Sequence, residues 1–235
     1  MEFAAFEVLR EAGISPNAMA GFSLGEVAAS TAAGIFDRET GFRLVCRRGE
    51  LMQHAAEQQD TAMAAVVKLT PNQVEELCRR FTHVYPVNYN CPGQISVAGL
   101  SSEMPEFSAA VKNAGGRAIP LKVKGAFHSD FMKEAADAFA QELEKVSFSA
   151  PTVALYSNMT AELYTTNVKD LLSKQICNPV RWESIIRNMI ASGVDTFVEI
   201  GPGKTLTNMV GKIDSGVKAY SVSELSVLLS EVKSC

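Results

Sequence analysis

The stretch GFSLGE, residues 21–26, limits the folds that this chain can adopt, because it places one serine between two glycines. Residues 17–22 form a short apolar run typical of a buried strand, and residues 24–33 are rich in helix formers. A G-x-S-x-G sequence between strand and helix is typical of a nucleophile elbow, a tight turn that projects the hydroxyl of Ser23 into open space. Ordinary loop chemistry can also produce a Gly-Ser-Gly turn. The motif alone leaves both interpretations open.

The order of the expected elements changes in the middle of the chain. Residues 61–124 predict a strand, a helix, two strands, a helix and a strand, at 61–69, 71–81, 83–88, 94–98, 101–115 and 117–124. This β-α-β-β-α-β order is the ferredoxin-like arrangement. Helices expected at 1–13, 38–57, 130–145, 168–175 and 181–192 alternate with strands at 153–156 and 196–200. That alternation predicts a largely parallel sheet covered by helices. We expect a core of residues 1–59 and 125–235 and an inserted small subdomain of residues 60–124.

Composition excludes several classes of protein. A net charge of −4 gives no general attraction to nucleic acid or to an anionic membrane. No apolar run approaches the ~18 residues of a membrane span, and the first residues carry acid where a secretory signal carries base. The spacing of the cysteines supports neither a zinc site nor a disulfide framework; they are Cys46, Cys78, Cys91, Cys177 and Cys235. We therefore expect a cytoplasmic protein without a metal site.

A serine nucleophile needs a base within hydrogen-bond reach, and the chain has three histidines. His54 lies beside two alanines on an expected helix and His83 opens an expected strand, so both are interpreted as structural or exposed. His128 lies where the small subdomain returns to the core, a junction where a cleft is expected. We take His128 as the candidate base, with a structural histidine as the alternative.

Arg48 is unusual in its helix. At about 100° per residue it falls in the middle of an apolar stripe that includes Leu44 and Met52. A buried guanidinium is costly unless an anion pairs with it. That anion is either an internal carboxylate such as Glu26 or Glu199, or the carboxylate of a substrate, which the guanidinium fork matches; a third alternative is that the side chain extends to water.

Two further stretches are interpreted as turns. Residues 88–94, NYNCPGQ, are expected to form a turn whose asparagine side chains cap it. Residues 199–204, EIGPGK, lack the full spacing of a phosphate-binding loop, so we expect a tight turn at the carboxyl end of a strand.

Six stretches of the chain, taken together and in order, resemble the malonyl-CoA:acyl carrier protein transacylase family. The stretches are GFSLGE, RGELM, PVNYNCPGQISVAG, GAFHSDFM, QICNPVRW and EIGPGKTL, and the match as a whole runs from about Gly13 to Leu206. The fold that the resemblance implies is a parallel-sheet α/β-hydrolase-like core with an inserted ferredoxin-like subdomain. Phe22 replaces the commoner histidine before the nucleophile. These stretches do not include the opening strand and G-Q-G-x-Q loop of the family, so we expect the chain to lack that segment.

The resemblance implies a role for individual residues. Ser23 is acylated, His128 is its base, and Arg48 binds the malonyl carboxylate. The main-chain N–H of Leu24 contributes to the oxyanion hole, and the main-chain carbonyl of Gln175 orients the histidine. Two more residues, Phe127 and Asn90, are implied in substrate binding, and Phe127 is expected to crowd the α-carbon of the acyl group.

The implied function is transfer of a malonyl group from malonyl-CoA, through a Ser23 acyl-enzyme, to the phosphopantetheine thiol of acyl carrier protein. The pathway is fatty acid or polyketide biosynthesis, and no resident cofactor is expected. Two alternatives remain: a weakly active or non-catalytic carrier-binding fragment, and a thioester hydrolase that uses the same serine and histidine without a preference for carboxylates.

Overall fold

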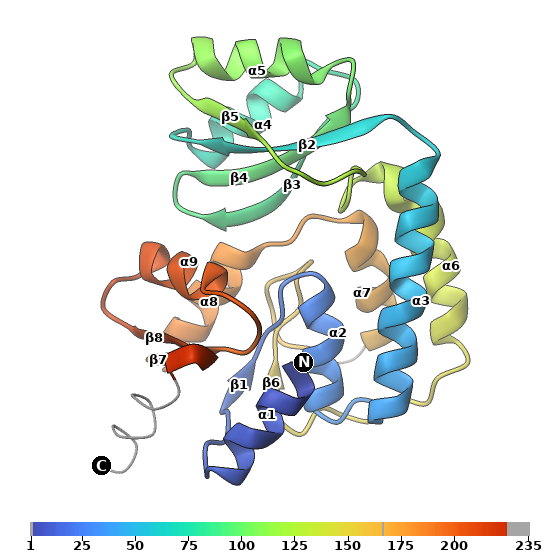
Figure 1. Ribbon diagram of the computed structural model, residues 1–235, viewed down its shortest axis with the longest axis vertical. Helices are drawn as coiled ribbons and strands as arrows, with labels where there is room; N and C mark the ends of the chain where they lie inside the picture. Colours follow the sequence, from blue (N-terminus) through green and yellow to red (C-terminus); the bar gives the residue numbers. More distant parts are fainter. Residues whose placement is uncertain (1, 166, 225–235) are drawn as a thin grey trace.

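A long helix, α3 (Arg38–Glu57), leads from the lower lobe of the molecule to a smaller upper lobe (Figure 1). The computed structural model describes residues 2–165 and 167–224, so Cys235 lies outside the described residues. Helix α3 begins where Asp37 accepts a hydrogen bond from the Thr40 N–H across 2.8 Å, a typical N-cap. Its bounds agree with those expected from the sequence.

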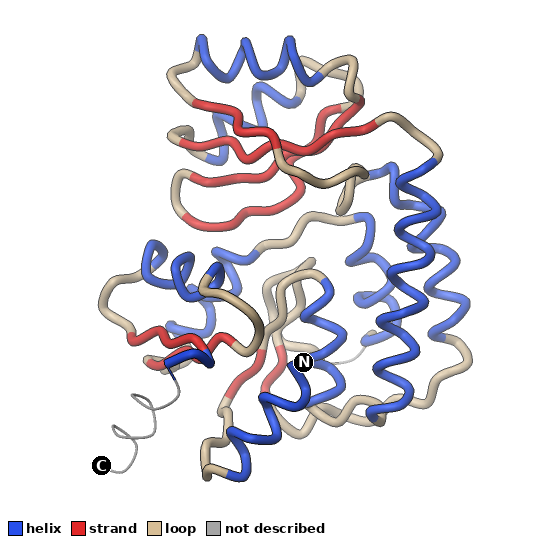
Figure 2. Tube along the Cα trace, viewed as in Figure 1, coloured by secondary structure: helices blue, strands red, loops and turns tan. Residues whose placement is uncertain are grey.

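The upper lobe is the inserted small subdomain. Its elements are β2 (Thr61–Val67), α4 (Pro71–Cys78), β3 (Val84–Cys91), β4 (Gln94–Leu100), α5 (Met104–Asn113) and β5 (Arg117–Pro120). The strands form one antiparallel sheet in the order β3-β4-β2-β5, which is the ferredoxin-like order that the sequence predicts. Both helices lie on the same face of this sheet (Figure 2).

The two faces of the small sheet have different partners. Ala64 and Val66 of β2 pack in the cluster under α4 and α5, whereas Met63 joins a second cluster on the opposite face. That second cluster contains Ala126 and packs against Phe127. Because the side chains of a strand alternate between the two faces of its sheet, β2 also attaches the subdomain to the segment before His128.

The lower lobe holds the remaining elements, and its strands pair in parallel. The helices are α1 (Glu2–Glu11), α2 (Leu24–Ala32), α3, α6 (Lys133–Leu143), α7 (Val168–Lys174), α8 (Trp182–Ala191) and α9 (Thr205–Ile213), with short 3₁₀ turns η1 (Asp130–Met132), η2 (Gln175–Cys177) and η3 (Val222–Glu224). Strands β1 (Ala18–Met19) and β6 (Ala154–Leu155) form one parallel pair, and β7 (Thr196–Glu199) and β8 (Lys218–Ser221) form another. The predicted α/β class is confirmed, with shorter strands than the apolar runs indicate.

The turn expected around Asn90 is shorter than predicted. Strand β3 continues through Cys91, which pairs with Gln94, so only two residues make the turn and Gly93 has a φ of 71°. Asn90 is therefore a buried strand residue that donates from Nδ2 to Ser96 Oγ across 3.2 Å. The expectation that its side chain caps the turn is wrong, because Asn90 lies at a register shift of β3 between Tyr89 and Cys91 and its side chain contacts Ser96 of β4.

Candidate active site

Ser23 stands in a strained turn between β1 and α2. Its φ of 53° and ψ of −106° lie outside the usual regions for a side-chain-bearing residue. Gly21 makes the turn possible, since a Cβ at this position would lie 1.9 Å from the carbonyl carbon of Gly25. This is the geometry of a nucleophile elbow. Leu24 begins α2, so its N–H has no acceptor within the helix and remains available for an anion.

His128 is in contact with this serine. Ser23 Oγ lies 2.7 Å from His128 Nε2, and His128 Nδ1 lies 2.8 Å from the main-chain oxygen of Gln175. Because a carbonyl oxygen only accepts, Nδ1 carries the proton and Nε2 is the acceptor for the serine hydroxyl. The contact that the sequence resemblance implies between Gln175 and the histidine is present.

The environment of His128 keeps the imidazole neutral. Burial, and then the nearby charge of Arg48, lower the pKa of His128 from 6.5 to about 4. A neutral imidazole with a free Nε2 is the form that accepts a proton from a serine at neutral pH.

Arg48 reaches the same serine from α3. Its Nη2 donates to Ser23 Oγ across 3.1 Å and to Gln175 Oε1 across 2.9 Å. The residue is 4% exposed, and its Nε has no hydrogen-bond partner among the described residues. Burial lowers the pKa of Arg48 to about 10, so the guanidinium remains charged at neutral pH.

The two carboxylates considered as partners of Arg48 have other contacts. Glu26 is fully buried, and its Oε1 accepts from Asn158 N across 2.8 Å and from Tyr164 Oη across 2.6 Å. Burial raises the pKa of Glu26 to about 7, a rise that these hydrogen bonds and Arg48 oppose. Glu199 instead caps α9, since its carboxylate accepts from the N–H of Thr207 across 2.7 Å. Residues 199–204 thus form the expected turn after a strand, and it leads from β7 into α9.

Sequence reasoning missed Asn158 and the side chain of Gln175. Asn158 is fully buried after β6, and its Oδ1 accepts from Ser23 N across 2.7 Å. Gln175 Nε2 donates to Ser23 O across 2.7 Å. The one sequence signal for Asn158 is its place in a polar loop after an expected strand, where functional loops of α/β proteins gather.

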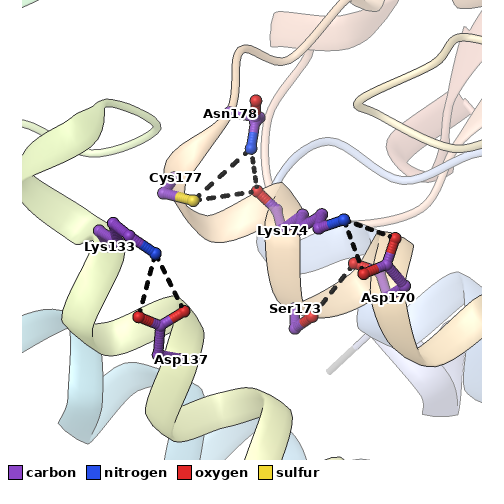
Figure 3. Close-up of polar contacts among 7 residues, drawn as sticks. All are labelled: Lys133, Asp137, Asp170, Ser173, Lys174, Cys177 and Asn178. Atoms are coloured by element: carbon purple, nitrogen blue, oxygen red, sulfur yellow. Dashed lines mark hydrogen bonds and ion pairs between the residues drawn. The ribbon is translucent and has the colours of Figure 1, made fainter.

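The turn that carries Gln175 is fixed on its outer side by polar contacts. Asn178 Nδ2 donates to the main-chain oxygen of Lys174 across 2.8 Å, and Cys177 Sγ lies 3.6 Å from the same oxygen (Figure 3). Lys174 pairs with Asp170 one helical turn earlier. These contacts cap the end of α7 next to Gln175.

The remaining predicted residues, Phe127 and Asn90, are not among the hydrogen-bond partners of Ser23. Phe127 is half-buried between the clusters of the two lobes, and its ring lies near Gly125, where an added Cβ would meet Phe127 Cζ at 3.0 Å. Phe22 packs edge-on against Trp182 with ring centroids 5.6 Å apart. Asn90 Oδ1 is buried and has no partner among the described residues.

Two kinds of feature are absent from the described residues. Within residues 2–165 and 167–224, no group of three or more His, Cys, Asp or Glu side chains is arranged to hold a metal ion. In the same residues no helix has the length and apolar character needed to span a membrane.

Comparisons with known proteins agree on one family. The sequence model described as "Acyl transferase domain" matches residues 1–228. The malonyl CoA-acyl carrier protein transacylase of Escherichia coli strain K12 is 37% identical over 230 residues, which are 95% of this chain and 74% of that protein. The crystal structure of the same transacylase from Clostridium perfringens superposes with a TM-score of 0.96 at 36% identity, covering 99% of this chain and 76% of that one. A complex of a type II PKS acyl-carrier protein with its malonyl-transacylase matches with a TM-score of 0.94 at 34% identity, over 98% and 78% of the chains.

Proposed function

This chain belongs to the acyl transferase domain family, and from that premise we propose that it is a malonyl-CoA:acyl carrier protein transacylase. The observation that carries the proposal is the convergence of two side chains on the hydroxyl of a third. His128 Nε2 and Arg48 Nη2 lie 2.7 and 3.1 Å from Ser23 Oγ. A base and a buried cation around one hydroxyl suit acyl transfer from a substrate that carries a carboxylate.

In the first half-reaction, Ser23 Oγ attacks the thioester carbonyl of malonyl-CoA and its proton passes to His128 Nε2. The developing oxyanion is stabilised by main-chain N–H groups, among them that of Leu24. The carbon–sulfur bond breaks, the proton on His128 goes to the CoA sulfur, and malonyl-Ser23 remains. The neutral imidazole and its fixed tautomer support this role for His128.

In the second half-reaction, the phosphopantetheine thiol of acyl carrier protein gives its proton to His128 and attacks the malonyl ester. The serine oxygen leaves and recovers the proton, so the enzyme returns to its starting state. Ser23, His128 and Arg48 supply the nucleophile, the base and the receptor for the acyl group, and we propose that no resident cofactor takes part.

Arg48 is proposed to bind the malonyl carboxylate. Its Nη2 is engaged by Ser23 and Gln175, whereas its buried Nε is left without a partner among the described residues. A buried, unsatisfied N–H on a charged side chain is costly, and a bound carboxylate would satisfy it. Asn90, whose buried Oδ1 is also unpartnered in that part of the chain, and Phe127 are proposed to line the acyl-binding space.

A cytoplasmic location is also proposed for this activity. The described cysteines Cys46, Cys78, Cys91 and Cys177 are all free thiols, which suits a reducing compartment.

The proposal is tested by intact mass measurement of the purified chain after mixing with malonyl-CoA. We expect a gain of one malonyl group on Ser23, absent in Ser23→Ala, and its loss on addition of holo acyl carrier protein. Release of CoA and free malonate at the same rate with and without the carrier would identify a hydrolase instead. No mass gain at all would favour a carrier-binding protein.

A further inference from the structure

The main chain of Ser23 is held on both sides by side-chain amides. Its N–H donates to Asn158 Oδ1 across 2.7 Å, and its carbonyl accepts from Gln175 Nε2 across 2.7 Å. The two amides lie next to each other, with Gln175 Nε2 3.4 Å from Asn158 Oδ1. The residue with an unusual φ and ψ is therefore fixed through its own two peptide groups.

Asn158 also holds the residue that enters the turn. Its Nδ2 donates to the main-chain oxygen of Gly21 across 2.6 Å, while its Oδ1 faces Ser23. An N–H can only donate and a carbonyl can only accept, so these partners define which end of the amide is oxygen. The side-chain amide of Asn158 thus joins Gly21 and Ser23, the two ends of the turn.

Asn158 is itself immobilised. Its main-chain N–H donates to Glu26 Oε1 across 2.8 Å, and its main-chain oxygen accepts from Arg181 N across 2.9 Å. The side chain is fully buried, so water does not compete for its hydrogen bonds. Asn158 is therefore fixed through both its main chain and its side chain.

We propose that Asn158 and the side chain of Gln175 are positioning residues that hold Ser23 in the strained conformation from which its hydroxyl reaches His128. The proposal rests on the proposed function only in taking Ser23 as the nucleophile. A sparsely populated backbone conformation persists only where its surroundings impose it. A displacement of the nucleophile by about 1 Å can slow a reaction about 100-fold.

Gln175 allows its two roles to be separated. His128 contacts its main-chain oxygen, which every substitution retains, whereas Ser23 contacts its side chain. Gln175→Ala therefore removes the hold on Ser23, together with the acceptor for Arg48 Nη2, and leaves the hydrogen bond that orients the imidazole. Asn158→Ala removes the contacts to Gly21 and Ser23 at once.

The experiment measures labelling of Ser23 by a fluorophosphonate probe, whose phosphorus forms a bond to Ser23 Oγ as fluoride leaves. The probe carries no carboxylate and so reports the reactivity of the serine without Arg48 as a receptor. Asn188→Ala is the matched control, because Asn188 Nδ2 donates to the main-chain oxygen of Ala161 across 3.0 Å and not to Gly21 or Ser23. Rates are expressed per folded molecule, determined from the thermal melting of each variant.

We expect Asn158→Ala and Gln175→Ala each to slow labelling by about 100-fold relative to the wild type. Because both side chains act through one conformation of Ser23, the double variant should label at most about 300-fold more slowly than the wild type. Asn188→Ala should label at the wild-type rate. If Asn158→Ala does not fold, Asn158→Asp decides: it keeps an acceptor for Ser23 N–H, loses the donor to Gly21, and should slow labelling by about 10-fold.

Labelling at the wild-type rate in the folded single variants would overturn the proposal, as would fully multiplicative losses in the double variant. A wild-type chain that reacts with the probe but gains no mass from malonyl-CoA would contradict the proposed function alone. In that case the comparison of labelling rates still decides the role of Asn158 and Gln175.

Discussion

Arg48 donates a hydrogen bond from Nη2 to the Oγ of Ser23, so the proposed receptor for the acyl carboxylate touches the proposed nucleophile. The separation of 3.1 Å brings a positive charge against the oxygen that becomes negative when it loses its proton. Recognition of the acyl group and activation of the serine therefore share one side chain. This arrangement predicts that changes at position 48 alter both substrate choice and serine reactivity.

Replacement of the guanidinium is expected to change the preference among acyl donors. Arg48→Ala should reduce malonyl transfer by on the order of 100-fold or more, because loss of a buried charged pairing costs ~2–5 kcal/mol. The rate of transfer from acetyl-CoA should increase relative to the rate from malonyl-CoA. Arg48→Lys is the control that keeps the charge without the planar fork, and it should recover only part of the malonyl rate. Initial rates with both donors decide, and an equal loss with the two donors would contradict the receptor role.

The pH dependence of serine reactivity should report the depressed pKa of His128. The base must be neutral, so labelling of Ser23 should stay constant down to about pH 5 and fall as the pH passes through the pKa of about 4. Removal of a neighbouring cation favours the imidazolium, so Arg48→Ala should shift the midpoint upward toward 6.5. A wild-type midpoint near 6.5 would show that the environment does not tune this histidine, and identical midpoints in both chains would show that the charge of Arg48 does not contribute to the shift.

Glu26 predicts a pH-dependent stability difference. Its pKa is about 7 in the folded chain against 4.5 as a free side chain, so the folded state binds more protons and the stabilisation is lost as the pH rises from 4.5 through 7. The amide in Glu26→Gln does not ionise. The free energy of unfolding of Glu26→Gln minus that of the wild type should therefore increase by about 2–3 kcal/mol between pH 5 and pH 8.

The measurement for Glu26 is urea unfolding of both chains at the two pH values. His128 is present in both, so its own titration cancels in the difference. The amide introduced by Glu26→Gln retains an oxygen that can accept from Asn158 and Tyr164, which keeps the comparison close to one of charge alone. A constant difference between the two pH values would mean that the carboxyl ionises as a free side chain does.

Phe127 predicts selectivity for acyl size. Its aromatic ring precedes His128 and is expected to crowd the α-carbon of the acyl group, so methylmalonyl-CoA should be a poor donor. One misplaced methyl group changes kcat/KM by about 10–200-fold. Phe127→Ala should bring the kcat/KM values for malonyl-CoA and methylmalonyl-CoA closer together. Phe22→Ala, which changes a ring packed on Trp182, should leave their ratio unchanged. Comparable use of both donors by the wild type would contradict this role.

Much of this architecture follows from local pattern. The spacing of apolar residues locates α3 and places Arg48 on its buried face, and the glycines around Ser23 indicate the elbow. The ferredoxin-like order follows from the succession of strands and helices. These features depend on residues close together in the chain, where period and turn chemistry carry the information.

The rest depends on contacts between distant segments. Asn158 lies in a loop without periodicity, and its hydrogen bonds to the elbow span 135 residues or more. The prediction for the turn at Asn90 is wrong because Pro92 and Gly93 suffice for the hairpin, a detail set by the pairing of β3 with β4. The bounds of helix α9 are not predicted, since its start depends on the cap from Glu199 rather than on its own composition.

The contacts of Ser23 lie 25, 105, 135 and 152 positions from it along the chain. The ribosome must therefore synthesise the whole inserted subdomain, and then Gln175, before Ser23 can form these contacts. Contacts of such long range form late, because the closure of each loop costs entropy before any contact compensates it. An immature chain carries an ordinary serine, and cellular thioesters are exposed to a reactive hydroxyl only when the synthesis and folding of these segments are complete.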